Sequence, residues 1–198
     1  DRNGNTTTFT DSGGNLATVT APDGRQVTFS YSGSLLTQLH DPLNRTVTIG
    51  YTSGRLTSIT DANGHTTVIT YDGSGLLQSI TDANDHTFVY NTYDSQGRVV
   101  QQYDAQNHLT TFQYDTANRR TTVTDPLGHT IGYDYDLAYR ITAETDGLGH
   151  TESYTYDANN NRLSVVDRNN HATNCTYDNR GNVLTVTNAL NGITTYTY

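Results

Sequence analysis

The sequence predicts an all-β protein in which tandem β-hairpin repeats form a continuous, curled antiparallel sheet. Three observations support this prediction. A unit of roughly 21 residues recurs about nine times, with no segment left over between copies. Each unit contains a stretch in which apolar and polar residues alternate, which is the period of a strand. The composition favours strands, with 15 Tyr and many Thr, and no stretch has a long helical period.

Composition also limits the class of partner. Only 16% of the residues are charged, the net charge is −9, and the 11 basic residues are all Arg. An acidic chain without a basic stripe is poorly suited to nucleic acid, and no apolar run reaches the ~20 residues of a membrane helix. The lone Cys175 excludes an internal disulfide framework. We therefore expect no nucleic-acid partner and no membrane insertion.

The first element of each unit is a turn, represented by Asp-Ala-Asn-Gly-His at residues 61–65. The Asp side chain can accept hydrogen bonds from the backbone that follows it, and Gly64 supplies a positive φ. Equivalent turns begin at Asp1, Ala21, Asp41, Asp82, Asp104, Asp125, Asp146, Asp167 and Asn188. Six of the turns end in histidine, at His65, His86, His108, His129, His150 and His171.

The second element is a strand that ends in a tyrosine. The tyrosine column consists of Tyr31, Tyr51, Tyr71, Tyr93, Tyr114, Tyr135, Tyr156, Tyr177 and Tyr198. The residue two positions earlier is usually apolar, as at Phe29, Ile69 and Phe112, whereas the intervening positions are mostly polar. Residues two apart share one face of a strand, so the sequence predicts an apolar face and a wetter face.

The third and fourth elements are a Tyr-Asp turn and a shorter strand. The aspartate column of this turn consists of Asp72, Asp94, Asp115, Asp136, Asp157 and Asp178. In the short strand, Leu56 and Ile59 are three positions apart, whereas Leu163 and Val165 are two apart. A β-bulge in some units would reconcile the two spacings.

One unit is therefore one hairpin, and a single hairpin is only marginally stable in water. We expect stacked hairpins to bury a shared face, with residues 1–198 forming a single array without a separate domain or linker. The pattern is already under way at both ends of the sequence, so we expect the array to be a piece of a longer chain.

The pattern Y-D-x-x-G-R-[L/V]-x-x-[I/V]-x-D-x-x-G-H-x-T resembles the YD repeat of the RHS (rearrangement hotspot) family. Residues 93–110 and 51–71 match it best, and the resemblance covers essentially the whole chain. Two places depart from it, since Asp11 stands where Tyr is expected and residues 188–192 lack the closing His.

The resemblance implies a hollow shell or tube. Members of this family include toxin-encapsulating proteins of bacteria, wall-associated YD-repeat proteins and teneurin-like adhesion receptors. In the toxins, a long strip of β-hairpins encloses a toxic polypeptide. A DPxG-containing stretch of the family plugs the shell and in some members cuts its own chain; residues 125–128 match only those letters, inside an ordinary repeat turn. We therefore assign no protease residues.

The recurring His and Asp columns could bind ligands, or they could only stabilise the turns. The histidines could form a metal-binding or pH-sensing ladder and the aspartates a calcium ladder, but no closed ligand cluster is visible in the pattern. We expect the histidines to close turns, and each aspartate to cap its own turn and pair with an arginine such as Arg55, Arg98, Arg119 or Arg140. Cys175 is expected to be an inert apolar-face residue.

The sequence thus predicts no enzyme, no catalytic residues, no metal and no cofactor. The leading hypothesis is a structural wall segment of an RHS/YD-repeat shell that encloses or carries a polypeptide toxin, secreted or exposed on the surface of a bacterial cell. Its partners would be other repeats of the parent chain, copies of itself and an enclosed toxin. The alternatives are an extracellular adhesive or fibre-forming array that assembles through open β edges and, more weakly, a carbohydrate-binding surface built on tyrosine.

Overall fold

The computed structural model describes residue 2, residues 4–9 and residues 13–198, so the expectations for Asp1 and Asp11 lie outside the described residues. Over the described residues the chain forms nineteen strands and no helix. The strands are β1 (Thr6–Phe9), β2 (Leu16–Thr20), β3 (Gln26–Ser32), β4 (Leu35–His40), β5 (Thr46–Thr52), β6 (Arg55–Thr60), β7 (Thr66–Tyr71), β8 (Leu77–Thr81), β9 (Thr87–Tyr93), β10 (Val99–Tyr103), β11 (Leu109–Asp115), β12 (Arg120–Thr124), β13 (Thr130–Tyr135), β14 (Ile141–Asp146), β15 (Thr151–Tyr156), β16 (Arg162–Val166), β17 (Ala172–Tyr177), β18 (Val183–Thr187) and β19 (Ile193–Thr195).

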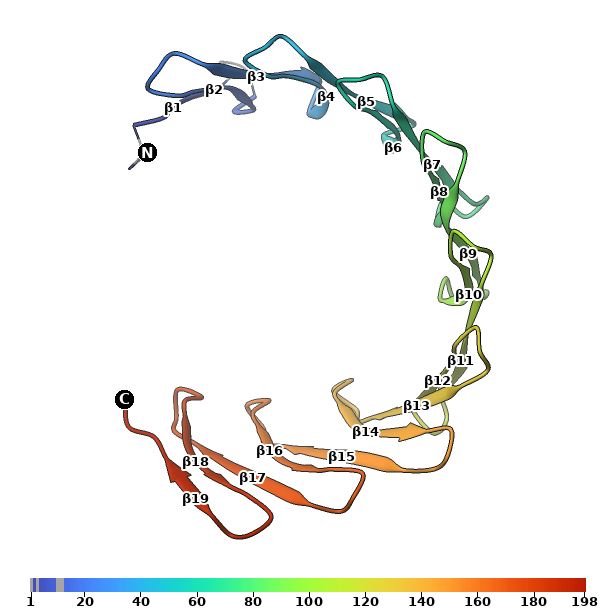
Figure 1. The fold of residues 1–198 in the computed structure, drawn as a ribbon, viewed down its shortest axis with the longest axis vertical. Helices are drawn as coiled ribbons and strands as arrows, with labels where there is room; N and C mark the ends of the chain where they lie inside the picture. The colour runs from blue at the N-terminus through green and yellow to red at the C-terminus, as the bar shows by residue number, and fades with distance from the viewer. Residues whose placement is uncertain (1, 3, 10–12) are drawn as a thin grey trace. The chain divides into compact units, whose positions relative to one another are not determined.

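The strands belong to two compact units. The first comprises Asp1–Arg98 and Gln102–His108, and the second comprises Val99–Gln101 and Leu109–Tyr198. Within each unit the strands lie side by side in the order of the chain, and in the first unit they follow an arc (Figure 1). The paired strands of each unit run antiparallel and are consecutive in sequence. The predicted fold class, an all-β array of tandem hairpins in a curled antiparallel sheet, is confirmed.

Two kinds of ladder alternate along each unit. Within a hairpin the ladder is long: β5 and β6 pair from Thr48↔Thr60 to Thr52↔Arg55. Between hairpins it is usually short, because β6 and β7 pair only at Ser58↔Val68, Ile59↔Thr67 and Thr60↔Thr66. The backbone at one end of each short strand therefore needs another hydrogen-bond partner.

The predicted bulge is present, and it lies in the short strand. Thr70 faces Ser79 while the next residue, Tyr71, faces Leu77, so Gln78 is the extra residue. The same shift occurs in the hairpins β3/β4, β5/β6, β13/β14, β15/β16 and β17/β18, and β11/β12 pairs without it.

The bulge changes one equivalence drawn from the sequence. Tyr156 faces Arg162, and Leu163 is the extra residue of its hairpin. Arg162 is thus the structural counterpart of Leu56, which faces Tyr51. Leu163 and Val165 are two positions apart because Leu163 is itself the bulge residue, so this hairpin also contains a bulge.

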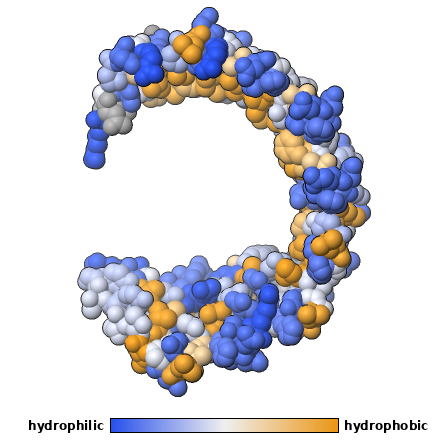
Figure 2. All heavy atoms as spheres, in the orientation of Figure 1, coloured by the Kyte–Doolittle hydropathy of each residue, from blue (hydrophilic) through white to orange (hydrophobic). Residues whose placement is uncertain are grey.

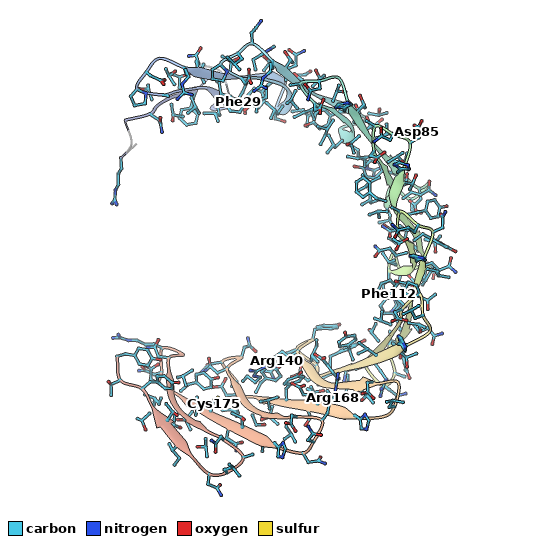
Figure 3. The ribbon with its side chains drawn as sticks, viewed as in Figure 1. Phe29, Asp85, Phe112, Arg140, Arg168 and Cys175 are labelled. Atoms are coloured by element: carbon cyan, nitrogen blue, oxygen red, sulfur yellow. The ribbon has the colours of Figure 1, made fainter. Side chains whose placement is uncertain are left out.

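The apolar face consists of short rows that run across neighbouring strands. Phe29 faces Leu39, which in turn faces Val47, and Ile49 and Ile59 continue the pattern in the next hairpin. In the first unit, apolar residues gather along the concave side of the arc (Figure 2), and Phe29 lies there (Figure 3). The predicted apolar face is therefore present.

The expectation that stacking would bury this face is wrong. None of the hydrophobic side chains in the described part of the chain is fully buried, and Val68 is 43% exposed. The physical reason is that the described strands make only side-by-side pairings, and no second layer packs on either face. Asn91, 6% exposed, is the one buried polar residue among those described.

Candidate functional site

The turns at the two ends of the hairpins have the same geometry, although their sequences differ. In the turn at residues 61–65, Asp61 Oδ1 accepts hydrogen bonds from the backbone N–H groups of Asn63 (2.8 Å) and His65 (2.9 Å). In the Tyr-Asp turn, Asp94 Oδ1 accepts from Gln96 (2.9 Å) and Arg98 (3.0 Å) in the same way. A left-handed residue follows three positions after each aspartate, for example Gly64 with φ 86°.

The aspartates of both turns thus cap their own turn amides, as expected from the sequence. In the Tyr-Asp column, Asp72, Asp94, Asp136, Asp157 and Asp178 accept from the residues two and four positions on, while Asp115 accepts from Asn118. In the stretch that resembles DPxG, Asp125 likewise accepts hydrogen bonds from the backbone N–H groups of Leu127 and His129. These contacts account for the recurrence of aspartate in both kinds of turn.

The predicted pairing of these aspartates with arginine holds for two of the four arginines. Arg98 lies 2.7 Å from Asp94, and Arg140 pairs with Asp136 in the same way. Arg55 instead lies over the ring of Tyr71, 5.6 Å from its centroid. Arg119 has a positive φ of 54° and donates to the carbonyl of Tyr135. The expectation is wrong for Arg55 because its own turn has Thr52 in place of the aspartate, and for Arg119 because the Asp115 turn bonds Asn118 instead.

The six predicted turn histidines each contact the aspartate that begins their turn. Nδ1 to Asp Oδ2 distances range from 2.9 Å at His129 to 3.5 Å at His86. The side chains stay solvent-exposed, between 57% at His108 and 73% at His129. The other pairs are His65–Asp61, His108–Asp104, His150–Asp146 and His171–Asp167. These pairs, with their backbone contacts, lower the pKa of the carboxyl groups; for Asp61 the largest cause is the hydrogen bond from the His65 backbone N–H.

The tyrosine column connects successive hairpins. The Tyr71 hydroxyl donates to the carbonyl of Leu56 at 2.9 Å, beyond the point where the β6/β7 ladder stops. The same contact occurs at four further tyrosines, Tyr93, Tyr114, Tyr156 and Tyr177, which donate to the carbonyls of Leu77, Val99, Ile141 and Arg162. The hydroxyl thereby satisfies a carbonyl that the short ladder leaves without a strand partner.

Eight of the nine tyrosines lie in strands, from Tyr31 and Tyr51 in the first unit to Tyr135, Tyr156 and Tyr177 in the second. Tyr198 is the exception, because it follows β19 and is 79% exposed. The other column tyrosines face a residue at the start of the next short strand, as Tyr71 faces Leu77, and Tyr198 is the last residue of the sequence.

In the second unit, a pair of glutamates interrupts the apolar rows. Glu144 and Glu152, the only two glutamates of the chain, face each other directly on β14 and β15. The Tyr154 hydroxyl lies 3.0 Å from Glu152 and 3.3 Å from Glu144. Burial, together with these carboxylates, raises the pKa of Tyr154 to about 12. The sequence alone does not place Glu144 opposite Glu152, because this depends on the register between the two strands.

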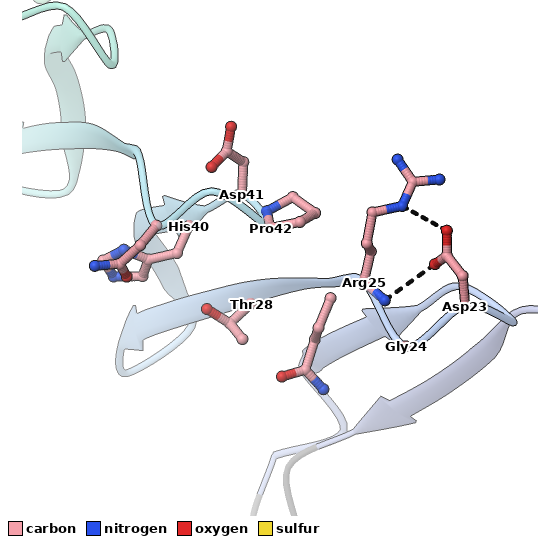
Figure 4. A pocket seen from close by; sticks show the side chains of 9 residues that line it. Asp23, Gly24, Arg25, Thr28, His40, Asp41 and Pro42 are labelled. Atoms are coloured by element: carbon pink, nitrogen blue, oxygen red, sulfur yellow. Dashed lines mark hydrogen bonds and ion pairs between the residues drawn. The ribbon is translucent and has the colours of Figure 1, made fainter.

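A shallow groove of about 580 Å³ lies at the turn edge of the first unit. It is lined by Asp23–Gln26, Thr28, His40–Pro42 and Asn44. Arg25 and Asp23 are already joined by a 2.7 Å ion pair, and the groove opens widely to solvent (Figure 4). Around the groove, Asp23 pairs with Arg25, Asp41 pairs with Arg45, and His40 contacts the Thr46 hydroxyl.

The remaining candidate chemistry is also sparse. Cys175 is half-buried and faces Val186 on the apolar face, at the position predicted for it. In the described part of the chain, no three His, Cys, Asp or Glu residues come together to hold one metal ion. No helix of the described residues could cross a membrane.

This geometry defines a class of protein, a tandem hairpin repeat. Its recurring Asp and His residues close the turns, and its recurring Tyr residues hydrogen-bond to the neighbouring hairpin. The RHS repeat family matches the sequence at residues 11–46, 51–87, 93–130, 121–151 and 135–172. The chain therefore belongs to the RHS repeat family.

Solved structures share the fold. The chain is similar to part of the TcdB2–TccC3 structure, with 14% identity, a TM-score of 0.59, and coverage of 93% of this chain and 14% of that one. It is also similar to part of the Tc holotoxin pore of Photorhabdus luminescens, in a form with mutated TccC3, with 13% identity and a TM-score of 0.57 over 93% of this chain and 15% of that one. The chain thus spans about one seventh of these relatives. No curated protein matches the sequence significantly.

Proposed function

We propose that this chain is a wall segment of an RHS-repeat shell that encloses or carries a polypeptide toxin. The observation that carries the proposal is the single-layer sheet, which has an apolar face but no buried core among the described residues. A sheet of this kind separates two spaces rather than forming a globule. Membership of the RHS repeat family and the fold shared with Tc toxin components support the toxin association.

In this proposal the chain is a non-enzymatic scaffold. The ionisable groups that recur are engaged in their own turns, and the described residues contain no metal-ligand cluster. Its partners are neighbouring repeats of the parent chain and the enclosed polypeptide, and its place is outside the bacterial cell or on its surface.

The direct test is limited proteolysis of the full-length parent protein with the polypeptide that follows its repeats. A shell predicts that this polypeptide resists a protease in the native protein and is digested after denaturation. Rapid digestion of the polypeptide in the native protein, while the repeats stay intact, would refute enclosure.

The fibre alternative makes a different prediction for the 198-residue chain. Negative-stain microscopy of filaments would favour an adhesive or fibrous array, whereas a monodisperse monomer favours a wall segment. Carbohydrate binding through tyrosine has less support, because five column hydroxyls already donate to backbone carbonyls.

A further inference from the structure

The Asp–His turns hold six imidazoles beside a carboxylate, five of them through an Nδ1 to Oδ2 hydrogen bond and His86 at 3.5 Å. Each turn joins a short strand to the long strand that follows, so the turns of a unit lie side by side at the same ends of its strands. We call this row of turns the Asp–His edge. Three consecutive Asp–His turns, ending at His65, His86 and His108, belong to the first unit, and three, ending at His129, His150 and His171, belong to the second.

The aspartate sets which ring nitrogen carries the proton. An ionised carboxylate only accepts hydrogen bonds, so a neutral imidazole that contacts it through Nδ1 must be protonated there. At His129 this contact is 2.9 Å, and Asp125 Oδ1 also fixes the His129 backbone N–H at 2.8 Å. The lone pair is then on Nε2. This carboxylate–imidazole arrangement is the one that orients histidine ligands in metalloproteins.

The outer nitrogen is accessible in each turn. The six histidine side chains are 57% to 73% exposed, and within the described residues their side-chain contacts are those to aspartate. In earlier turns the corresponding position is arginine, at Arg25 and Arg45, and each of these is paired with a turn aspartate. The potential ligands are thus confined to the later turns.

The spacing determines what such a row can bind. Neighbouring strands are about 4.8 Å apart, so turns two strands apart repeat at roughly 10 Å. This exceeds the separation of two nitrogens on one Zn²⁺, since each Zn–N bond is about 2 Å. Each turn can therefore supply one ligand, and the remaining coordination positions of the ion must be filled by ligands that come from outside this row of turns.

We propose that the Asp–His edge binds divalent transition metals such as Zn²⁺, and that the ions bridge it to the same edge of a second copy of this chain. A second copy offers imidazoles at the same repeat distance, so several weak bridges can form together. Each added bridge then becomes an intramolecular step, which multiplies the weak affinity of one imidazole. The inference rests on this edge and is independent of the proposed shell.

Sedimentation velocity of the 198-residue chain with ZnCl₂ tests the proposal. The expected result is a shift from monomer to dimer that EDTA reverses and that MgCl₂ does not produce, because Mg²⁺ prefers oxygen ligands. The shift should be lost or weakened at least tenfold in the sextuple variant H65Q/H86Q/H108Q/H129Q/H150Q/H171Q, which removes all six turn imidazoles. An unchanged mass in ZnCl₂, or a shift that persists in this variant, would overturn the proposal.

His40 provides a matched control. It is half-buried in β4, and its Nδ1 contacts the hydroxyl of Thr46 at 2.9 Å instead of an aspartate. H40Q should dimerise in ZnCl₂ like the unsubstituted chain, and equal loss in H40Q and the sextuple variant would contradict the assignment to the edge. Circular dichroism checks that each variant is folded. In ¹⁵N spectra of the imidazoles, Zn²⁺ should shift Nε2 of the turn histidines and leave His40 unchanged, and the reverse would also overturn the proposal.

Discussion

Removing one tyrosine hydroxyl tests how successive hairpins are joined. In the Tyr71→Phe variant the ring and its contact with Arg55 remain, and only the 2.9 Å hydrogen bond to the Leu56 carbonyl is lost. A hydrogen bond of this kind contributes about 1 kcal/mol, and water can partly replace it at this half-buried site. We therefore expect the hairpins on either side to open about fivefold more often.

Hydrogen exchange of backbone amides measures this effect where it occurs. Repeats contact only their neighbours, so exchange should accelerate in β6 and β7 and stay unchanged in β17 and β18. Tyr139→Phe is the matched control, because Tyr139 is 84% exposed and its ring stacks on Tyr135 without using the hydroxyl. Unchanged exchange in β6 and β7, or equal acceleration in the control, would refute the joining role of the hydroxyl.

Three further predictions concern the face, the turns and pH. Ile69→Asp should lower the free energy of unfolding in urea by about 1–3 kcal/mol, because a charge replaces an apolar residue facing Ile80. His108→Asn should change the free energy of unfolding by less than ~0.5 kcal/mol, because its side chain is exposed. Equal effects of the two variants would contradict the assignment of these columns. Gly64→Ala should reduce the melting temperature, with a cost of about 1 kcal/mol at φ 86°, and an unchanged value would argue against the turn geometry. Hydrogen bonds lower the pKa of Asp61 in the folded state, so the stability that this group contributes is present above its ordinary pKa of 3.8 and is lost as the pH falls through the folded value. Circular dichroism titration should show the array weakening below about pH 4, and a gain there would contradict the turn-cap role.

Periodicity was sufficient to predict the strands and turns, because alternation and turn residues act locally. The Asp column is a good example, since an aspartate caps amides only two and four residues away. The bulge could be inferred from the spacing of Leu56 and Ile59, but its place in each hairpin could not, because register depends on pairing between strands. This is why Arg162 was not recognised as the counterpart of Leu56.

Other features depend on what surrounds a residue and left little trace in the sequence. The carbonyl of Leu56 accepts the Tyr71 hydroxyl through the backbone, so the side chain at that position carries no signal of the contact. The missing core could not be inferred either, because an alternating strand looks the same whether its apolar face is covered by a second layer or left open. The paired Glu144 and Glu152 became visible as neighbours only with the register of β14 and β15.

The joint between hairpins has a consequence for how such genes change. Each tyrosine reaches only the hairpin before it, and each turn is closed by its own aspartate. A whole unit can therefore be duplicated or deleted by recombination between similar stretches of DNA, and the new neighbours meet through the same hydroxyl and carbonyl. The number of units can then differ between relatives without compensating substitutions, whereas the insertion or deletion of one residue inside a unit would shift the register of its strand.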